Sequence, residues 1–273
     1  MAVQKIAHIH IQDGGVDFFM DLDPASRFDN TIISHLAAGS FYEPDVISLI
    51  MRTITPGDVV IDVGANVGYF SCLLALLVGK SGKVVAFEPD SNNLSGLTRN
   101  LAANQLDNIL IINKPASNKK GFMRFFNNED SGGHALWDAA GKGNFVEMET
   151  TTLDEEFRKT NLAPPKLIKI DTEGADHLVL EGARELLKDH KVPYIVAEVL
   201  PQGLAKFGSS QMQMRRYMKD FGYDTFAIYW RGHLPKLIPA DTVIEHEYVM
   251  NILFSTPEDV GRAWPTESYT VAL

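Results

Sequence analysis

The chain has 273 residues, of which 45% are hydrophobic and 22% charged, and its formal net charge is −10. This length and composition are typical of a soluble globular protein with one large domain or two small ones and a sizeable core. The negative charge disfavours a nucleic-acid partner, because phosphate backbones are bound by clustered Lys and Arg.

The sequence predicts neither a membrane span nor a secretory signal. Its apolar runs are shorter than the roughly 20 residues that cross a bilayer, and His8 and His10 interrupt the region where a signal peptide would be apolar. The single cysteine, Cys72, excludes an internal disulfide framework and fits a reducing cytoplasm. We therefore predict a cytoplasmic protein in which Cys72 is a small core residue.

The first elements form an N-terminal extension, which we place at residues 1–39. Apolar alternation on both sides of Gly14-Gly15 predicts a β-hairpin followed by a helix, at 5–11, 16–22 and near 29–38. Residues 40–273 are predicted to form one further domain, which begins with a helix from Pro44 to about Ile54, where apolar residues recur at helical spacing.

Apolar strands then alternate with helices, which predicts an α/β fold with a mostly parallel sheet covered on both faces. Seven strands are expected, at 58–63, 83–88, 108–113, 166–171, 193–199, 223–229 and 248–254. Helices are expected at 68–79, 91–104, 174–190 and 210–221. The last two strands lack a helix between them, so we expect antiparallel pairing there. Residues 117–152 interrupt the alternation with hairpin-like pieces.

A glycine-containing turn follows the first strand of this sheet, in the stretch VVIDVGANVGYFS from Val59 to Ser71. In an open α/β sheet, ligands bind beyond the carboxyl ends of the strands. The pattern G-x-N-x-G lacks the middle glycine of the dinucleotide fingerprint and the Gly-Lys-Ser/Thr ending of a P-loop. Both phosphate-binding interpretations are therefore weak.

Asp62-x-Gly64-x-Asn66-x-Gly68 resembles instead the first motif of the Rossmann-like, class I methyltransferases that use S-adenosylmethionine. The next strand ends in Phe87-Glu88-Pro89-Asp90, and an acid at that edge can accept hydrogen bonds from ribose hydroxyls. Two structural alternatives stay open: the glycines may serve only a tight turn, and Glu88 may cap the next helix.

The segment from Leu167 to Ala183 is similar to the K-I-D-x-E-G-A signature of the FkbM methyltransferase family. Phe41-Tyr42-Glu43-Pro44, Thr152-Leu153-Asp154 and the strand-end Glu198 match further elements of that family, in order. Thr172 and Asp176 depart from it, where valine and glutamate are common. The resemblance covers about residues 40–200, and it implies a Rossmann-like methyltransferase fold with a seven-stranded sheet, an antiparallel last strand and S-adenosylmethionine as cofactor.

The resemblance and the strand ends together give the predicted cofactor-binding residues: Glu43, Asp62, Gly64, Asn66, Gly68, Tyr69, Phe70, Glu88, Pro89, Ala116, Ser117 and Asp171. At Ala116 and Ser117, backbone N–H groups can read the adenine edge in this fold. A plain turn from strand to loop is the alternative at that position.

Asp171, Glu173 and His134 are the predicted catalytic residues, because methyl transfer to a hydroxyl needs a group that removes its proton. Asp171 ends the fourth strand at the cofactor edge, although a binding or structural role is the alternative there. Glu173 lies on the same side if the strand continues, or caps the following helix. His134 is a loop histidine, for which plain solvation is the alternative. Asp171, Glu173, Glu198 and His134 can also form an oxygen-rich metal site, but their spacing does not demand one and no metal is predicted.

The leading hypothesis is an O-methyltransferase acting on a hydroxyl of a sugar, glycan or small natural product. Methylation at nitrogen or carbon on the same fold remains open, because acids alone do not identify the acceptor. A non-catalytic binding protein is a different class of function, and the combination of an intact loop, Glu88 and Asp171 argues against it. An oxidoreductase is disfavoured by the missing third glycine.

Overall fold

The computed structural model of the chain describes residues 5–11, 15–128, 133–135, 145–229, 233–244 and 249–265. Its N-terminal hairpin consists of β1 (Lys5–Ile11) and β2 (Val16–Leu22), which pair antiparallel, and helix α1 (Arg27–Ala37) follows. The predicted extension therefore has the expected elements. Ser26 begins α1 by accepting a hydrogen bond from the Asp29 amide, an N-cap of the usual kind.

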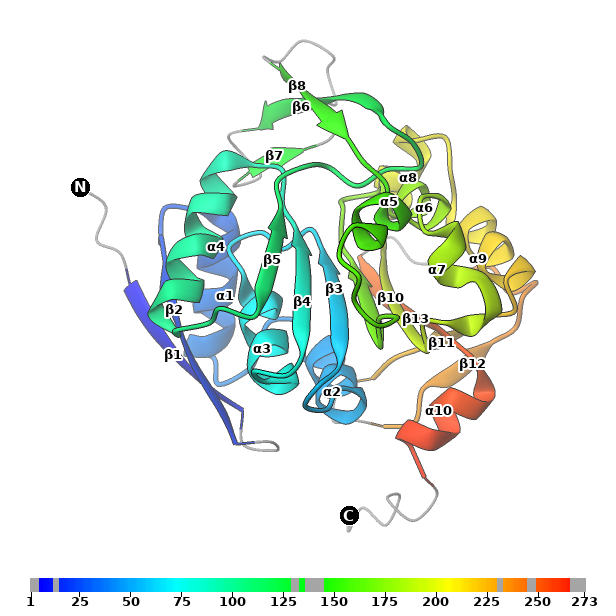
Figure 1. Cartoon of the computed structure of the whole chain (residues 1–273), viewed down its shortest axis with the longest axis horizontal. Coiled ribbons are helices and arrows are strands. Elements are labelled where there is room, and N and C mark those ends of the chain that lie inside the picture. The colour runs from blue at the N-terminus through cyan, green and yellow to red at the C-terminus, as the bar shows by residue number, and fades with distance from the viewer. Residues whose placement is uncertain are drawn as a thin grey trace.

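An eight-stranded sheet forms the centre of the molecule, in the order β12-β11-β13-β10-β9-β3-β4-β5 (Figure 1). Its strands are β3 (Val59–Val63), β4 (Lys83–Phe87), β5 (Ile109–Ile112), β9 (Leu167–Ile170), β10 (Tyr194–Val199), β11 (Asp224–Ala227), β12 (Lys236–Ile238) and β13 (Met250–Ser255). The run from β5 to β10 is parallel, and β13 pairs antiparallel with both β10 and β11. The sheet thus contains the seven expected strands and one short edge strand, β12.

Helices cover both faces of the sheet because alternate residues of each strand enter two separate cores. Val60 belongs to the first core and Ile61 to the second. The first core includes residues of the hairpin and of α1, α2 (Pro44–Thr53), α3 (Tyr69–Val78), α4 (Ser91–Ala103) and α10 (Pro257–Ala263). The second includes residues of α5 (Leu153–Arg158), α6 (Asp176–Glu181), α7 (Arg184–Leu187), α8 (Pro201–Lys206) and α9 (Gln211–Asp220).

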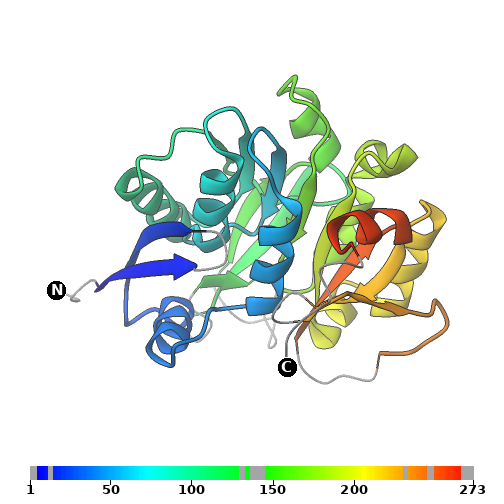
Figure 2. The ribbon, with the colours of Figure 1, turned by 90° about the horizontal axis from the view of Figure 1, so that it is seen from below.

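Polar side chains fix the hairpin to the sheet domain. Asn100 of α4 accepts a hydrogen bond from the Asp21 amide (2.7 Å) and donates to the Val67 carbonyl (2.7 Å). Asn104 bonds both backbone groups of Phe19 at 2.7 Å. Figure 2 shows the hairpin beside the helices of this face. The extension and the glycine turn before α3 are therefore held by the same buried asparagine.

Two departures from the predicted elements have local causes. The expected helix at 174–190 is divided into α6, α7 and a 3-10 turn, Lys188–His190. Gly182 lies at the break, where a Cβ would stand 2.1 Å from the Ser117 carbonyl oxygen. The hairpin-like pieces in 117–152 form a small separate sheet of β6 (Gly121–Asn128), β7 (Gly133–Ala135) and β8 (Phe145–Thr150). Among the described residues, every helix is too short or too polar to cross a bilayer.

Candidate active site

The turn after β3 is held against the ends of two neighbouring strands. The amides of Gly64 and Ala65 both donate to the Phe87 carbonyl of β4, at 3.0 Å. On the other side, Gly64 adopts φ +83°, and a Cβ there would lie 1.9 Å from the Asp171 carbonyl oxygen. Gly64 is therefore required by contact with the end of β9, a neighbour that the sequence did not reveal.

The other two residues of the motif also have conformations that restrict residue type. Asn66 adopts φ +51°, a left-handed conformation that asparagine tolerates better than most residues. Gly68 adopts φ +93° at the start of α3, and a Cβ there would meet a Leu97 side-chain carbon at 2.7 Å. Gly68 is the N-cap residue of α3, so no side chain caps the first amides of this helix.

Glu88 joins this turn to the next one. Its Oε2 accepts the Asn66 amide at 2.7 Å and its Oε1 accepts the Asp90 amide at 2.8 Å. Asp90, not Glu88, caps α4 by accepting the Asn92 and Asn93 amides. Glu88 is only 4% exposed, and burial raises the pKa of its carboxyl group to about 8, against the hydrogen bonds that favour the charged form. Each oxygen keeps further acceptor capacity for a ligand hydroxyl.

The raised pKa of Glu88 predicts that the protein becomes less stable as pH rises. Between the ordinary value of 4.5 and the folded value of about 8, the folded state keeps a proton that the unfolded chain has lost. Stability from this group is therefore full below the lower value and lost through the upper one. We expect the urea unfolding free energy to fall between pH 4.5 and about 8, and Glu88→Gln to show a shallower fall. An equal slope in the variant would contradict this assignment.

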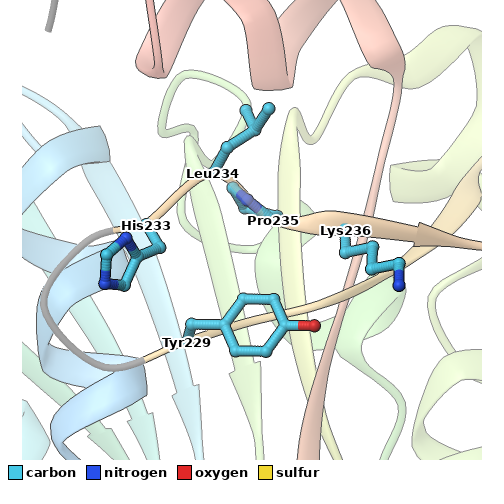
Figure 3. Close-up of a pocket in the computed structure, with 5 residues that line it drawn as sticks. All are labelled: Tyr229, His233, Leu234, Pro235 and Lys236. Atoms are coloured by element: carbon cyan, nitrogen blue, oxygen red, sulfur yellow. The ribbon is translucent and has the colours of Figure 1, made fainter. Parts of the chain in front are cut away.

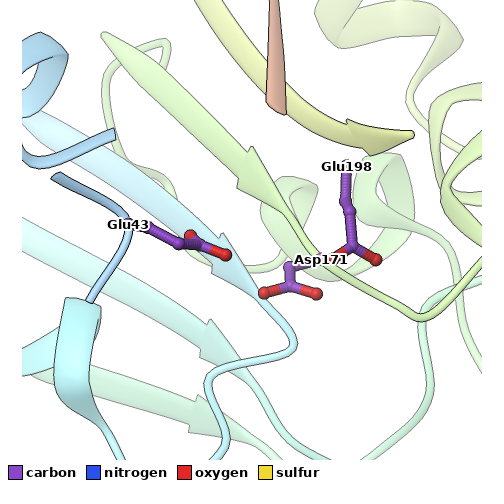
Figure 4. A group of neighbouring side chains, drawn as sticks. All are labelled: Glu43, Asp171 and Glu198. Atoms are coloured by element: carbon purple, nitrogen blue, oxygen red, sulfur yellow. The ribbon is translucent and has the colours of Figure 1, made fainter. Parts of the chain in front are cut away.

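Three carboxylates from distant parts of the chain meet at the carboxyl ends of β9 and β10: Glu43, Asp171 and Glu198 (Figure 4). One oxygen of each lies within 4.8 Å of the others. Glu43 stands at the start of α2 with φ 44°, and burial raises the pKa of its carboxyl group to about 7. Burial, with the charge of Asp171, also raises the pKa of Glu198 well above its usual value. This group of three is called the carboxylate cluster below.

Lys169 lies beneath the carboxylate cluster. Its Nζ binds Asp171 Oδ2 at 3.0 Å and stands 4.5 Å from the centre of the Phe70 ring. The side chain is 2% exposed. Burial opposes its charge, but the neighbouring acids outweigh burial and raise the pKa of Lys169. Lys169 is thus a buried cation that is paired with a carboxylate.

Two further acids next to the cluster have structural contacts. Asp62 is fully buried and accepts the Ser71 hydroxyl at 2.6 Å. Asp176 is also fully buried, accepts the Gly174 amide at 3.1 Å, and burial raises the pKa of its carboxyl group to about 7. Sequence reasoning noted Asp176 only as a departure from the family pattern, because its burial depends on the tertiary fold.

Glu173 neither extends β9 nor caps α6. It follows Asp171 in a turn with φ 55°, and Gly174 continues that turn at φ 106°. The N-cap residue of α6 is Ala175, with no side-chain cap. The capping alternative for Glu173 is therefore not realised, and a catalytic role for it stays a prediction.

The aromatic and proline positions of the predicted cofactor set have packing roles. Tyr69 and Phe70 are 2% and 5% exposed and meet edge to face, with ring centroids 5.1 Å apart. Tyr69 also packs against Phe18 and Tyr42. Pro89 is partly buried between Glu88 and the helix cap. Their contact with a cofactor stays a prediction.

The T-L-D element (Thr152-Leu153-Asp154) is bonded to the segment that follows α6. Asp154 accepts the amides of Glu185 and Leu186 at 2.9 and 3.0 Å, and its own amide donates to the Gly182 carbonyl. Ala116 forms a bridge to Thr151, and the Ser117 amide donates to the Thr151 carbonyl at 2.8 Å. These contacts support the structural alternative at Ala116 and Ser117, since that amide is already bonded.

The side chain of His134 lies outside the described residues, and only its backbone, in β7, is placed. A cavity of about 440 Å³ lies near the same edge of the main sheet, after β11 (Figure 3). Its lining residues, which the sequence did not single out, are Tyr229, His233, Leu234, Pro235 and Lys236. Because β11 runs parallel to β10, this lining begins at the edge that carries the carboxylate cluster.

Comparison with known proteins gives matches by family, sequence and structure. A family model described as the methyltransferase FkbM domain matches residues 62–225. The hexuronic acid methyltransferase AglP of Haloferax volcanii is 26% identical over 159 residues, which are 58% of this chain and 62% of that protein. The match thus spans less than two thirds of that relative. The family match contains the glycine turn, Glu88, Asp171 and Glu198.

Similar solved structures include a putative methyltransferase from Streptococcus mutans in complex with SAH, with TM-score 0.46 and 11% identity over 78% of this chain and 98% of that one. Fibrillarin from Aeropyrum pernix with natively bound S-adenosyl-L-methionine has TM-score 0.43 and 11% identity, and the match covers 93% of this chain and 100% of that one.

Proposed function

Because the chain belongs to the FkbM methyltransferase family, which uses S-adenosylmethionine as methyl donor, we propose that it methylates a hydroxyl oxygen of a carbohydrate acceptor. The observation that supports this most directly is the contact between the glycine turn and the strand end that carries Asp171. A carboxylate beside the turn that contacts the cofactor can act on an acceptor presented to the methyl group.

The residues around the turn fit a cofactor that carries positive charge. Oδ1 of Asp62, a fully buried carboxylate next to the turn, has no hydrogen-bond partner among the described residues. Buried oxygens of this kind are costly unless a ligand binds them. S-Adenosylmethionine has a sulfonium and an ammonium group, and an anionic donor set matches both. We assign its nucleoside to the turn and Glu88, and its charged end to the side facing Asp62.

The bound cofactor supplies an activated methyl group. The acceptor oxygen would take this methyl group, and the electron pair of the broken carbon–sulfur bond would stay with sulfur. The hydroxyl proton passes to a base, for which Asp171 is the proposed residue. Lys169 donates a hydrogen bond to Oδ2 of Asp171, which fixes the orientation of the carboxylate and leaves Oδ1 as the proposed proton acceptor. The buried surroundings keep this geometry without further ordering.

A carbohydrate acceptor is favoured by the sequence relative, whose name records a hexuronic acid. The cavity after β11 supports the same class. Tyr229 is 43% exposed there and offers a ring face for a sugar's C–H groups. Lys236 and His233 line the same cavity and can attract a carboxylate. The cavity lies two strand spacings from β10 in the sheet order, or about 10 Å, which is the reach of a disaccharide.

The test uses the purified chain, methyl-labelled S-adenosylmethionine and a matched acceptor panel: uronic-acid glycosides, neutral hexosides and amines. We expect a labelled methyl ether on the uronic-acid acceptors, identified by mass spectrometry and NMR. Calorimetry should show binding of S-adenosylmethionine and not of NAD, weakened by about 1–3 kcal/mol in Glu88→Gln. Label on nitrogen or carbon would overturn O-methylation, and absence of turnover on every acceptor would favour a non-catalytic binding protein.

A further inference from the structure

The carboxylate cluster combines features that the proposed reaction base does not explain. Its three side chains come from the start of α2 and from the ends of two adjacent parallel strands, β9 and β10. One oxygen from each of Glu43, Asp171 and Glu198 lies within 4.8 Å of the other two. A proton acceptor needs one carboxylate, whereas three carboxylates this close repel one another when charged, and a cation between them relieves that repulsion.

Unsatisfied hydrogen-bonding groups in the cluster provide a second, independent observation. Glu198 is only 6% exposed, and its Oε2 has no hydrogen-bond partner in the described part of the chain. Oε2 of Glu43 is also buried and has no hydrogen-bond partner there. Figure 4 shows both carboxylates directed toward Asp171. Buried carboxylate oxygens without donors are costly unless a ligand binds them, and here they belong to side chains that lie close together.

Lys169 does not satisfy these oxygens. Its printed bond is to Asp171 Oδ2, at 3.0 Å, so it anchors one member of the cluster from beneath. Lys169 also packs on the Phe70 ring, which keeps its ammonium on that side. Oε2 of Glu43 and Oε2 of Glu198 therefore remain available to a second positive charge.

We propose that Glu43, Asp171 and Glu198 bind a divalent cation of the oxygen-preferring class, such as Mg²⁺ or Mn²⁺. These ions take six oxygen ligands at about 2.1 Å and usually keep several waters. Three carboxylates supply half of that set after small side-chain movements, and the remaining positions stay open to water and to a ligand hydroxyl. This site differs from the metal set considered for the sequence, because Glu43 replaces Glu173 and His134.

The role of the cation, as distinct from its binding, rests on the proposed function. A divalent cation beside Asp171 attracts electron density from the acceptor hydroxyl and eases loss of its proton. This assigns the acceptor side of the site to Glu198 and the cofactor side to the glycine turn. The cation therefore adds a requirement for an oxygen acceptor, since amines bind such hard ions poorly.

Calorimetric titration of MnCl₂ into the chelator-treated full-length protein, without cofactor or acceptor, tests the site directly. We expect saturable binding of one ion per chain. Glu198→Gln and, separately, Glu43→Gln should each lower the affinity by about 10-fold or more. Glu258→Gln is the matched control, because that glutamate is exposed on α10 and far from the cluster in sequence and structure. Circular dichroism establishes that each variant is folded.

A competition experiment then distinguishes the two positively charged groups that the cluster could bind, a divalent ion and the ammonium group of S-adenosylmethionine. We expect S-adenosylmethionine to bind in the presence of Mn²⁺. The affinity for Mn²⁺ should then stay within about threefold of its value without the cofactor. Displacement of Mn²⁺ by the cofactor would show that the cluster binds the cofactor's ammonium group and would overturn the proposal. Undetectable Mn²⁺ binding, or equal affinity in Glu198→Gln, would overturn it as well. Absence of methyl transfer to every acceptor would refute only the function proposed above, because the Mn²⁺ titration is done without an acceptor.

Discussion

We expect Asp171→Asn to lower the rate of methyl transfer by about 100-fold or more while leaving the affinity for S-adenosylmethionine within a few-fold of wild type. Asparagine nearly preserves the shape of the side chain, but it can neither take a proton nor offer an anionic oxygen. The loss is of the size seen when a general base is removed. The expectation holds for both proposed roles of this carboxylate, as base and as cation ligand.

The contacts of Asp171 define the control measurements. Its Oδ2 is the acceptor for the buried Lys169, so the variant leaves that ammonium with the charges of Glu43 and Asp62. We expect a modest loss of stability, which urea unfolding measures separately from turnover. Asp220→Asn, at the exposed end of α9, is the matched control and should change neither quantity.

Three results distinguish the possible roles of Asp171. Loss of cofactor binding together with turnover would make Asp171 a binding residue, and Glu173 would be the next candidate base. Turnover within tenfold of wild type would contradict any chemical role. If a chelator abolishes the activity of the wild-type protein and Mn²⁺ restores it, most of the turnover lost in Asp171→Asn is due to loss of the cation.

Local sequence patterns predicted most of the fold because they are determined within a few residues. The hairpin strands β1 and β2 have the predicted bounds, since alternation and Gly14-Gly15 are sufficient to specify a hairpin. The parallel strands were found from short apolar runs, as expected for a sheet covered on both faces. The edge strand β12 was missed because only three residues pair with β11, and they do not alternate.

Tertiary contacts explain the elements that local patterns misjudged. The predicted helix at 174–190 has helical spacing throughout, but Gly182 must let the Ser117 carbonyl approach, and the helix is divided there. The short helices α5 and α8 were not predicted. Thr152 caps α5 and Pro201 begins α8, which are signals that identify a helix start but not its length.

The candidate site was predictable strand by strand but not as a cluster. Glu88 and Asp171 follow strands and could be placed at the sheet edge from sequence alone. Their proximity to Glu43 could not, because it depends on where the start of α2 lies against β9 and β10. Gly64 illustrates the same limit. The pattern indicated a glycine turn, but not that the Asp171 carbonyl oxygen lies against it.

That contact gives the second large expected effect, in Gly64→Ala. The added Cβ would stand 1.9 Å from the Asp171 carbonyl oxygen, closer than any non-bonded contact allows, and φ is +83°. The Asp171 amide is bonded to the Val63 carbonyl at 3.0 Å, so neither segment can move without breaking the end of the β3–β9 pairing. We expect urea unfolding to show a loss above about 3 kcal/mol, beyond the usual range for single substitutions.

Gly39→Ala is the control that separates conformation from collision. Gly39 adopts a similar φ of +72°, and a Cβ there meets nothing within 4 Å. It should lose only about 1–2 kcal/mol, the cost of a left-handed conformation. The difference between the two variants then measures the contact with Asp171 alone. Because that contact positions the carboxylate, Gly64→Ala should also weaken Mn²⁺ and cofactor binding, whereas Gly39→Ala should leave both unchanged. Equal stability losses in the two variants would mean that the turn and the end of β9 are not held together. They would contradict the contact through which we propose that the cofactor turn positions Asp171.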